Sequence, residues 1–395
     1  MARYLVIGGG VTGLSAALDL ATSGHDVEVV ERKSVVGGEV LAYCCKATDS
    51  CARCGVCVAH RRIAEALRHP RVRVHTGSTL TAADTGGDRI ALQIACALPS
   101  IDYRLCVGCD RCAEACPEKC ITRVARAELL QYRIDHSSCR LHRGIACTAC
   151  VDACPAGAVT AGASGRRESL TARACLVATG HEPFAAADKP RYGYGRVGGV
   201  ITGREAEEIL SRAGALGENV KSVAFVQCVG SRDPAAGRPW CSAACCAYAV
   251  RLARMLRHRD PASEVTVYYI DLQSFDKCFP GFRDEVSALG VELVRGVPFR
   301  MDETSDGRVR VSVEAQGAAP STREHDRVVL SVGLGPASGS ASLAALLGLG
   351  SDSAGFFRSA APNVLVAGTC ARPQTIPECI GEAAAMAGRM QGLAS

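Results

Sequence analysis

Long apolar runs and clustered charges are both missing from this sequence. Although 48% of its 395 residues are hydrophobic, no stretch approaches the roughly 18 uninterrupted apolar residues of a membrane-spanning helix. Its 45 Lys and Arg residues are dispersed and form no basic run. Because such runs are typical of nucleic-acid binding, these absences argue against a transmembrane segment and against nucleic acid as a partner.

Constellations for acid–base catalysis are also missing. The nine His residues are scattered, and no Ser/His/Asp triad or pair of carboxylates stands out. No helix-turn-helix pattern occurs in a basic context, which argues against a DNA-reading redox sensor. The opening MARYLVIGGG has the pattern of a buried strand and a glycine turn. It does not have that of a signal peptide, so we expect a cytoplasmic protein.

Cysteine, in contrast, is abundant, with 23 residues in the chain. In a short secreted chain this density would predict disulfides, whereas the cytoplasm keeps thiols reduced. Closely spaced cysteines in a long cytoplasmic chain are typical of metal ligands. The spacing of the cysteines is therefore the main evidence on function.

The start of the chain predicts a dinucleotide-binding turn. Tyr4–Ile7 is an apolar strand, Leu14–Thr22 an alanine-rich helix and Asp26–Val30 a second strand. The G-x-G-x-x-G turn between them allows a tight bend, close approach of a pyrophosphate and packing of helix on strand. An acid at the end of the second strand would bind ribose hydroxyls. The residues expected to contact the dinucleotide are Gly8, Gly10, Val11, Thr12, Gly13, Glu31 and Arg32.

Later segments favour FAD over NAD as the dinucleotide. Gly37-Gly38 and the turn Ala178-Thr179-Gly180 resemble the flavoproteins with two dinucleotide domains, typified by thioredoxin reductase. In that family both features belong to the FAD domain. The segment ending in Gly368 resembles the family's C-terminal flavin motif, although Thr369 stands where that motif has Asp.

The middle of the chain holds two runs of the bacterial ferredoxin type, each ending in Cys-Pro. In proteins with two such runs, the fourth Cys of each run ligates the other [4Fe–4S] cluster. The second run has its first cysteine displaced to Cys139 by an insertion. Zinc is the alternative metal for C-x2-C pairs. The exchange predicts one cluster on Cys106, Cys109, Cys112 and Cys154 and another on Cys116, Cys139, Cys147 and Cys150.

Two further groups of thiols predict two more clusters. Cys45, Cys51, Cys54 and Cys57 follow the flavin turn, preceded by Cys44 as a spare, with zinc or a redox dithiol as alternatives. The other group lies where a second Rossmann unit would have its glycine turn, of which only Gly230 remains. We expect a cluster in place of an NAD site, the alternative being buried or disulfide-bonded cysteines. Its ligands would be Cys228, Cys241, Cys245 and Cys246.

The other cysteines are expected to be small core residues, because several adjoin apolar strands. For Cys278, in the turn FDKCFPGF, a place in a partner's site is a less favoured alternative. The core group comprises Cys96, Cys120, Cys175, Cys370 and Cys379.

These motifs together resemble HdrA, the flavin-containing component of heterodisulfide reductase, over essentially the whole chain. The segments that carry the resemblance are GGGVTGLSAALDLA, RYGYGRVGGVITGREAEEIL, VQCVGSRDPAAG, CSAACCAYAV, VVLSVGLGP and IPECIGEAAAMAG. The resemblance implies an α/β fold of the thioredoxin-reductase type, with two dinucleotide domains and an inserted ferredoxin-like domain with two [4Fe–4S] clusters. It also implies flavin contacts at Ile376 and Pro377, and a flavin-proximal cation at Arg251, where relatives usually have Lys.

This interpretation divides the chain into five segments. We expect a hairpin within residues 71–95 and a single strand, LTARACLVATG, over residues 170–180. The segments are the first part of the FAD domain (1–98, with the iron–sulfur loop 44–57), the ferredoxin-like insert (99–162), the second part of the FAD domain (163–219), a degenerate NAD-type Rossmann domain (220–330) and the C-terminal part of the FAD domain (331–395).

The resemblance implies an electron-transfer component that contains FAD and about four [4Fe–4S] clusters. It would relay electrons between a donor module (hydrogenase, formate dehydrogenase or NADH type), ferredoxin and HdrB- and HdrC-like partners. Flavin-based electron bifurcation is the sharper form of this hypothesis, and a homodimer within a larger complex suits the family. The alternative is a stand-alone flavoenzyme that reduces a small disulfide, sulfur compound or CoA thioester.

Overall fold

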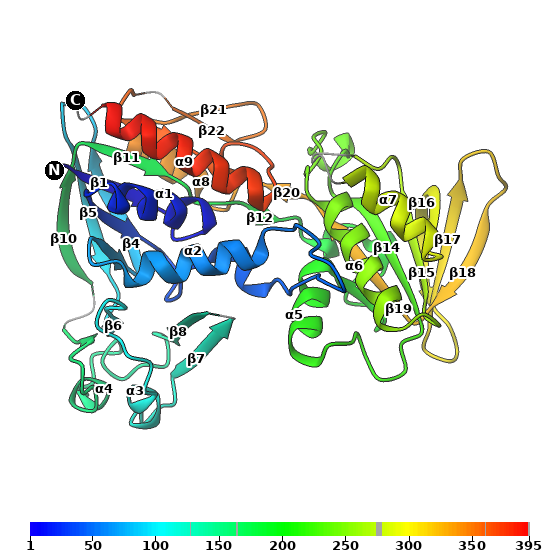
Figure 1. Cartoon of the computed structure of the whole chain (residues 1–395), viewed down its shortest axis with the longest axis horizontal. Helices are drawn as coiled ribbons and strands as arrows, with labels where there is room; N and C mark the ends of the chain where they lie inside the picture. The colour runs from blue at the N-terminus through cyan, green and yellow to red at the C-terminus, as the bar shows by residue number, and fades with distance from the viewer. Residues whose placement is uncertain (127, 163–164, 274–278, 360, 394–395) are drawn as a thin grey trace.

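The computed structural model describes all residues except 127, 163–164, 274–278, 360 and 394–395, and arranges them in two lobes and an insert (Figure 1). The first lobe is built on a five-stranded parallel sheet in the order β23-β11-β1-β2-β3. Its strands are apolar because helices cover one face and a second sheet covers the other. The bounds are β1 Arg3–Ile7, β2 Asp26–Val30, β3 Val72–His75, β11 Ala174–Val177 and β23 Val364–Val366.

Helices α1 (Val11–Thr22), α2 (Val56–Arg68) and α9 (Ile376–Gly392) pack together on one face of this sheet. The other face packs on an antiparallel sheet of β4 (Ser78–Asp84), β5 (Ile90–Cys96) and β10 (Arg166–Ala172). This core contains segments from both ends of the chain. The fold of the first lobe is therefore complete only when β23 and α9 have packed into it.

The structure corrects two of the expected elements. Val72–His75 is not part of the hairpin, because it pairs in parallel with β2 as the edge strand of the main sheet. The hairpin consists of β4 and β5. Residues 170–180 do not form one strand, because the chain passes from β10 in the antiparallel sheet to β11 in the parallel sheet. A two-residue period identifies a strand but not its partner.

The insert lies beside α2 and consists of short helices and paired strands (Figure 1). Its ends meet where β6 pairs with β9, so the chain enters and leaves at one point. The elements are β6 Ser100–Ile101, α3 Arg111–Glu114, β7 Ile121–Arg126, β8 Leu129–Ile134, α4 Ala149–Asp152 and β9 Val159–Thr160.

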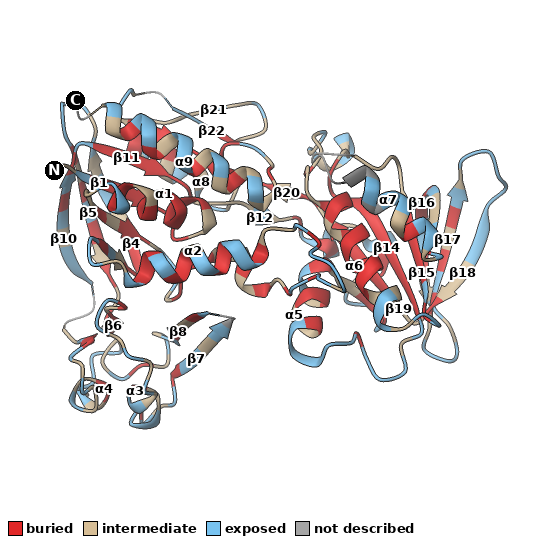
Figure 2. Ribbon diagram, viewed as in Figure 1, coloured by how far each residue is buried: buried red, intermediate tan, exposed pale blue. Residues whose placement is uncertain are grey.

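The second lobe is a Rossmann-like unit with a seven-stranded sheet in the order β13-β19-β14-β15-β16-β17-β18. β14 lies inside this sheet and is buried along its whole length (Figure 2). The bounds are β13 Val200–Thr202, α5 Gly203–Ala213, β14 Ser222–Val229, α6 Cys245–Arg259, β15 Glu264–Tyr269, α7 Phe279–Ala288, β16 Glu292–Glu303, β17 Val309–Ala315, β18 Ser321–His325 and β19 Arg327–Val332.

The sheet of the second lobe begins earlier than the expected boundary at residue 220. Val200–Thr202 pairs in parallel with β19, and α5 packs into the core of this lobe. The two lobes are linked by β12 (Glu182–Pro183), which pairs with β20 (Leu334–Gly335). Other short elements are η1 Gly38–Ala42, η2 Ala186–Asp188, η3 Pro190–Tyr192, η4 Pro234–Ala236, α8 Ser340–Leu347, β21 Gly350–Ser351, β22 Phe357–Arg358 and η5 Gly368–Cys370.

Within the described part of the chain, no helix has both the length and the apolar character needed to cross a membrane.

Candidate cofactor sites

The glycine turn between β1 and α1 has the geometry of a dinucleotide cradle. Gly8 has a φ of +111°, and a Cβ added to it would lie 2.3 Å from the carbonyl oxygen of Ala178. A Cβ on Gly13 would lie 2.0 Å from the carbonyl oxygen of Gly8, which explains the close packing of α1 on β1. Gly10 faces open space and is the N-cap of α1, with no side chain capping that end. The first-turn N–H groups, which include those of Val11 and Thr12, therefore remain available for a pyrophosphate. The residues of this turn thus fit the pyrophosphate of a bound dinucleotide.

Glu31 shapes this cradle by binding peptide N–H groups. Its Oε2 accepts a hydrogen bond from Gly9 N (2.7 Å) and its Oε1 accepts one from Lys33 N (2.7 Å). The Glu31 carboxylate, which follows the end of β2, thus fixes the position of Gly9 in the middle of the glycine turn. Arg32, the next residue, is exposed.

The loop that contains Gly37 and Gly38 is held in place by the insert. Gly37 has a φ of +114° and donates its N–H to the Gly9 carbonyl at 2.7 Å. Val36 N donates to Oε1 of Gln131 (3.0 Å), and Nε2 of Gln131 donates back to Val36 O (2.7 Å). Gln131 belongs to β8 and is completely buried. The insert is therefore attached directly to the loop that contains Gly37 and Gly38.

The C-terminal flavin segment lies against the same turn. A Cβ on Gly368 would lie 2.4 Å from Oγ1 of Thr12. Thr369, at the position of the expected Asp, has its Oγ1 2.9 Å from Nδ1 of His181, directly after Gly180. The carboxylate of Glu382 on α9 accepts the N–H of Gly368 at 2.6 Å.

Sequence reasoning missed Glu382, because nothing in the spacing shows that α9 returns to this loop. Ile376 and Pro377 occupy the first turn of α9, behind a capping box of Thr375 and Glu378.

The first predicted ligand set of the insert lines one cavity. Cys106, Cys109, Cys112 and Cys154 surround it, together with Tyr132. Burial and the neighbouring Cys106 raise the pKa of the Cys112 thiol to about 11. Such crowded thiols ionise readily only when a cation binds them. The exchange of the fourth cysteine between the two runs is thus present in the geometry.

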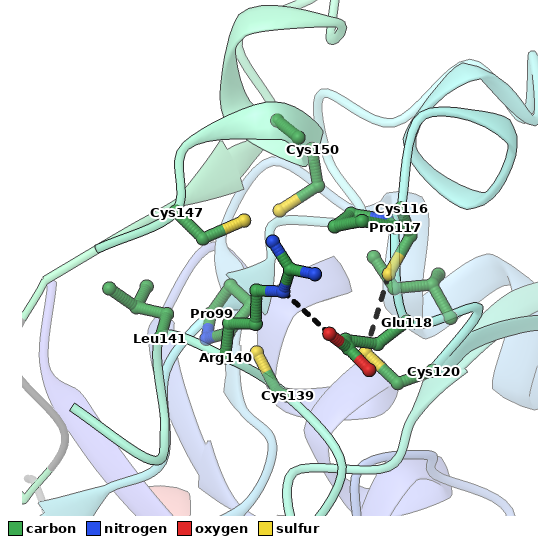
Figure 3. Close-up of a pocket in the computed structure, with 12 residues that line it drawn as sticks. Pro99, Cys116, Pro117, Glu118, Cys120, Cys139, Arg140, Leu141, Cys147 and Cys150 are labelled. Carbon is green, nitrogen blue, oxygen red and sulfur yellow. Dashed lines mark hydrogen bonds and ion pairs between the residues drawn. The ribbon is translucent and has the colours of Figure 1, made fainter. Parts of the chain in front are cut away.

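The second cavity holds the other predicted set and an additional thiol (Figure 3). Its walls carry Cys116, Cys139, Cys147 and Cys150, and also Cys120. Cys120 Sγ lies 3.4 Å from Cys116 Sγ. Burial and the hydrogen bond to Cys116 raise the pKa of Cys120 to about 12. The expectation that Cys120 is a plain core residue therefore needs correction, because it shares the cavity with the predicted ligands.

Loop 44–57 crosses from the first lobe to the second (Figure 1). Its cysteines differ in exposure, since Cys44 is buried, Cys54 is half-buried and the others are exposed. Cys44 packs in the core of the second lobe, and its backbone N–H donates to Oε2 of Glu207 at 2.8 Å. Cys45 is therefore the better candidate for the fourth ligand beside Cys51, Cys54 and Cys57.

Contacts at several points hold this loop. Lys46 forms a buried ion pair with Glu207 of α5 at 2.5 Å. Nε of Arg251, on α6, donates to the carbonyl of Ala52 at 2.8 Å. A Cβ on Gly55 would lie 3.0 Å from the Ile376 side chain. The loop thus lies between α5 and α6 on one side and the start of α9 on the other, and Arg251, the expected flavin-proximal cation, touches it.

The fourth ligand set converges at the carboxyl end of β14. Burial and the charges of Cys246 and Cys241 raise the pKa of the Cys228 thiol to about 12, and Cys245 hydrogen-bonds with Cys246. Cys228 has a φ of +61°, a conformation rare outside glycine that is concentrated at functional sites.

Gly230, the glycine that remains in this region, is explained by packing. A Cβ on Gly230 (φ +69°) would lie 2.1 Å from the ring of Phe184, so only glycine fits against this ring. The turn also lacks the further glycines of the first cradle, so it does not provide the open approach seen at Gly10. Among the remaining cysteines, Cys175, Cys370 and Cys379 are buried as expected, and Cys278 lies outside the described residues.

The class of protein follows from matches to known families and to solved structures. Residues 105–158 match the family of 4Fe-4S dicluster domains, and residues 6–44 match an NAD(P)-binding Rossmann-like domain. The fold is similar to that of thioredoxin reductase from Lactococcus lactis (TM-score 0.55, 15% identity, 100% of this chain and 99% of that one). Thioredoxin reductase from T. acidophilum gives the same TM-score, 0.55, at 13% identity over 99% of both chains. The chain thus has a thioredoxin-reductase-like α/β fold with an inserted iron–sulfur dicluster domain.

The sequence relatives are more specific. The HdrA protein of the H(2):CoB-CoM heterodisulfide,ferredoxin reductase of Methanothermobacter marburgensis is 31% identical over 98% of this chain and 63% of its own length. The corresponding iron-sulfur protein of the CoB–CoM heterodisulfide reductase of Methanocaldococcus jannaschii is 31% identical over 96% of this chain and 62% of its own length. The resemblance to the HdrA family of heterodisulfide reductases is therefore confirmed. The chain spans a little over three-fifths of the length of these relatives.

Proposed function

We propose that this chain is the electron-transfer component of an oxidoreductase complex of the heterodisulfide reductase type. The supporting observation is adjacency: Gln131 joins the dicluster insert to the flavin loop, and loop 44–57 contacts both α6 and the start of α9. Bound FAD exchanges electrons singly or in pairs, whereas [4Fe–4S] clusters exchange them singly. Side chains that hold both kinds of cofactor next to each other suit a relay.

In this proposal the chain holds one FAD and four [4Fe–4S] clusters. The flavin dinucleotide is held by the turn from Gly8 to Gly13, by Glu31, Arg32, Gly37 and Gly38, and by the segments 178–180, 368–369 and 376–377. The cluster ligands are Cys106, Cys109, Cys112 and Cys154; Cys116, Cys139, Cys147 and Cys150; Cys45, Cys51, Cys54 and Cys57; and Cys228, Cys241, Cys245 and Cys246.

Arg251 acts in this proposal as a fixed, buried cation. Its side chain is 6% exposed and bonded to the cysteine loop. Guanidinium groups keep their charge at any physiological pH. Arg251 therefore stabilises the negative charge that this region gains on reduction. This role is electrostatic and positional, and it does not involve proton transfer.

The partners follow from the relatives. Their names include hydrogen, formate and ferredoxin beside the CoB-CoM heterodisulfide. We infer that this chain receives electrons from a donor module of the hydrogenase, formate dehydrogenase or NADH type. It passes them to ferredoxin and to HdrB- and HdrC-like partners, as a homodimer within a larger complex in the cytoplasm.

Electron bifurcation is the finer form of the proposal. It requires that the one-electron form of the flavin be sparse, because the second electron must leave at a much lower potential than the first. A reductive titration of the anaerobic holoprotein, followed by visible and EPR spectra, tests this. A one-electron flavin form that accumulates at moderate potential would contradict bifurcation while leaving the relay intact.

The main experiment is anaerobic affinity purification of the tagged chain from its own host, with cofactor analysis. The expected result is FAD, about sixteen irons per chain and co-purified HdrB- and HdrC-like proteins with a donor module. The isolated chain should not be reduced by NADH, because only Gly230 remains of the glycine turn that an NAD pyrophosphate needs. Flavin bleaching by NADH, or turnover of a small disulfide by the chain alone, would instead establish a stand-alone flavoenzyme.

A further inference from the structure

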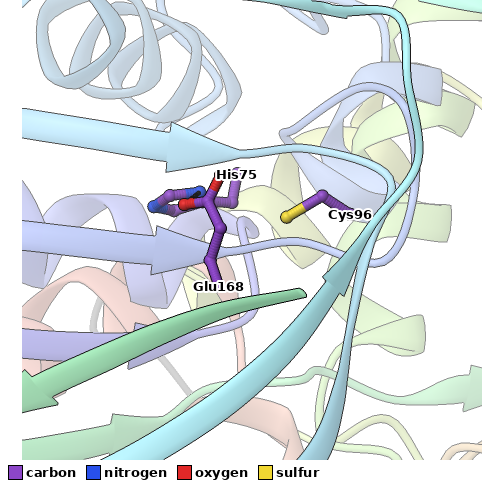
Figure 4. A group of neighbouring side chains, drawn as sticks. All are labelled: His75, Cys96 and Glu168. Carbon is purple, nitrogen blue, oxygen red and sulfur yellow. Dashed lines mark ion pairs between the residues drawn. The ribbon is translucent and has the colours of Figure 1, made fainter. Parts of the chain in front are cut away.

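Three donor side chains that none of the cofactor sites uses converge inside the first lobe (Figure 4). His75 ends β3, Cys96 ends β5 and Glu168 lies on β10. Their ligand atoms all lie within 4.8 Å of one another. His75 and Cys96 are each 7% exposed. These strands come from two different sheets, so the group exists only in the folded lobe.

Each nitrogen and carboxylate in the group has an orienting neighbour. Nε2 of His75 lies 2.7 Å from Oε2 of Glu28 on the adjacent strand β2, which leaves Nδ1 facing the group. Nδ1 lies 3.7 Å from Oε2 of Glu168, and the other oxygen of Glu168 lies 3.3 Å from Arg166. Metal-binding histidines regularly direct their second ring nitrogen to a carboxylate in this manner.

The donor set selects a class of metal. One thiolate, one imidazole and one carboxylate are the ligands of Zn²⁺, whereas Ca²⁺ and Mg²⁺ prefer oxygen alone. A single cysteine also excludes a [4Fe–4S] cluster, which takes four. Zinc–ligand bonds of about 2.0 to 2.3 Å require the three side chains to contract by only about 1 Å.

We propose that His75, Cys96 and Glu168 bind one Zn²⁺ ion, with the fourth position open to water and Glu28 as the outer partner of His75. The alternative is an ordinary buried imidazolium between two carboxylates. That alternative needs no thiol, yet Cys96 lies within the same 4.8 Å group.

The ion would brace the nucleotide end of the first lobe. The carbonyl of His75 accepts the N–H of Glu31 at 2.9 Å, and the carbonyl of Glu31 accepts the N–H of Ser78 at 2.9 Å. Glu31 in turn holds the glycine turn through Gly9. A metal that ties β3, β5 and β10 together therefore fixes the strand ends from which the dinucleotide cradle is built.

The test is metal analysis of the anaerobic holoprotein from zinc-supplemented cells. We expect about one zinc per chain, with a zinc K-edge spectrum of one sulfur neighbour and otherwise nitrogen or oxygen. Cys96→Ala should lose this zinc and retain its iron. Cys175→Ala, which removes a fully buried core thiol on β11, is the matched control and should retain the zinc. Glu28→Gln should weaken zinc binding by about 10- to 100-fold.

Two results would overturn the proposal. One is a folded holoprotein without zinc. The other is zinc surrounded by four sulfurs and unaffected by Cys96→Ala, which would place the metal in a cluster site. If Cys96→Ala fails to fold, Glu168→Gln replaces it, because this side chain is 18% exposed and its substitution leaves the core intact. Retention of the zinc in that folded variant would equally refute the site.

Discussion

Five thiols share the second cavity of the insert, although a [4Fe–4S] cluster takes four. Cys120 lies 3.4 Å from Cys116 and also neighbours Cys139. We expect that Cys116→Ala retains its cluster with an altered EPR spectrum, because Cys120 replaces the lost thiolate. The double variant Cys116→Ala/Cys120→Ala should lose about four irons per chain, as measured by iron analysis.

The first cavity provides the control for this prediction. Its thiols are Cys106, Cys109, Cys112 and Cys154, without a fifth among its lining residues. Cys106→Ala should therefore lose about four irons as a single substitution. An equal loss from Cys116→Ala alone would show that Cys120 does not act as a spare ligand.

His325 is the residue from which we expect a pH dependence of stability. It is buried in the second lobe between Ser222 Oγ (2.9 Å) and Tyr268 OH (3.0 Å). Burial, then the charges of Arg323 and Arg308, lower its pKa from 6.5 to about 4. The unfolded chain therefore binds the proton first as the pH falls. The stabilisation is complete above pH 6.5 and is lost progressively down to about pH 4.

The size of this effect follows from linkage. Between about pH 7.5 and about pH 5 the loss is about 2 kcal/mol, or about 4 to 8 °C in the unfolding temperature of a domain of this size. Anaerobic calorimetry of wild type and His325→Asn measures it, and the variant should lose less on acidification. His258→Asn, at an exposed position, should follow the wild type. Parallel pH profiles of wild type and His325→Asn would contradict the prediction.

At the scale of elements, the buried Lys46–Glu207 pair decides whether loop 44–57 stays docked. Both side chains are at most 3% exposed. Glu207→Gln leaves the Lys46 ammonium buried without a counter-ion, which costs about 3–5 kcal/mol. We expect the loop to detach and about four irons to be lost, as measured by iron content and by protease sensitivity of the loop.

Glu208→Gln is the matched control, because Glu208 is the next residue and pairs with Arg204 at the surface. Exposed pairs contribute about 0–1 kcal/mol, so this variant should keep its iron. The double variant Lys46→Met/Glu207→Leu should recover part of the stability, because the unpaired charge is removed while the backbone N–H and C=O of Cys44 lose these partners. Loss of iron from Glu208→Gln would show that charge alone, not burial, controls the loop.

Much of the element order could be predicted from sequence, because the core strands are short apolar runs next to glycine turns. β1, β2, β14 and β19 are of this kind. β16 could not be predicted, since Glu292–Glu303 alternates irregularly and its register shifts near Pro298. The partner of β3 could not be predicted either, because periodicity does not encode pairing.

The candidate sites divide in the same way. Thiols that lie in one motif, such as Cys106, Cys109 and Cys112, are visible as spacing, and the structure places them around one cavity together with Cys154. Cys120 was misjudged because its place in the cavity depends on the fold of the insert. The convergence of His75, Cys96 and Glu168 depends on the order of strands in two sheets, which no local pattern contains.

For the whole molecule, the attachment of the insert to the first lobe is the feature on which the relay depends. Gln131 makes two buried hydrogen bonds, at 3.0 and 2.7 Å, to the backbone of Val36 next to Gly37. Gln131→Leu leaves a buried N–H and a buried C=O without partners, at about 1–3 kcal/mol each. We expect weaker FAD retention and faster proteolysis at the ends of the insert, while the clusters of the insert keep their iron.

This outcome separates docking from folding, because Gln131 contacts the flavin loop and is not among the residues that line either thiol cavity. FAD retention is measured by gel filtration of the anaerobic holoprotein, and electron transfer by the rate at which chemically reduced flavin passes electrons to the clusters. Gln93→Leu, at an exposed position on β5, should behave as wild type in both assays. If Gln131→Leu keeps its flavin and the wild-type rate, the insert is held by other contacts. The relay then does not depend on this joint.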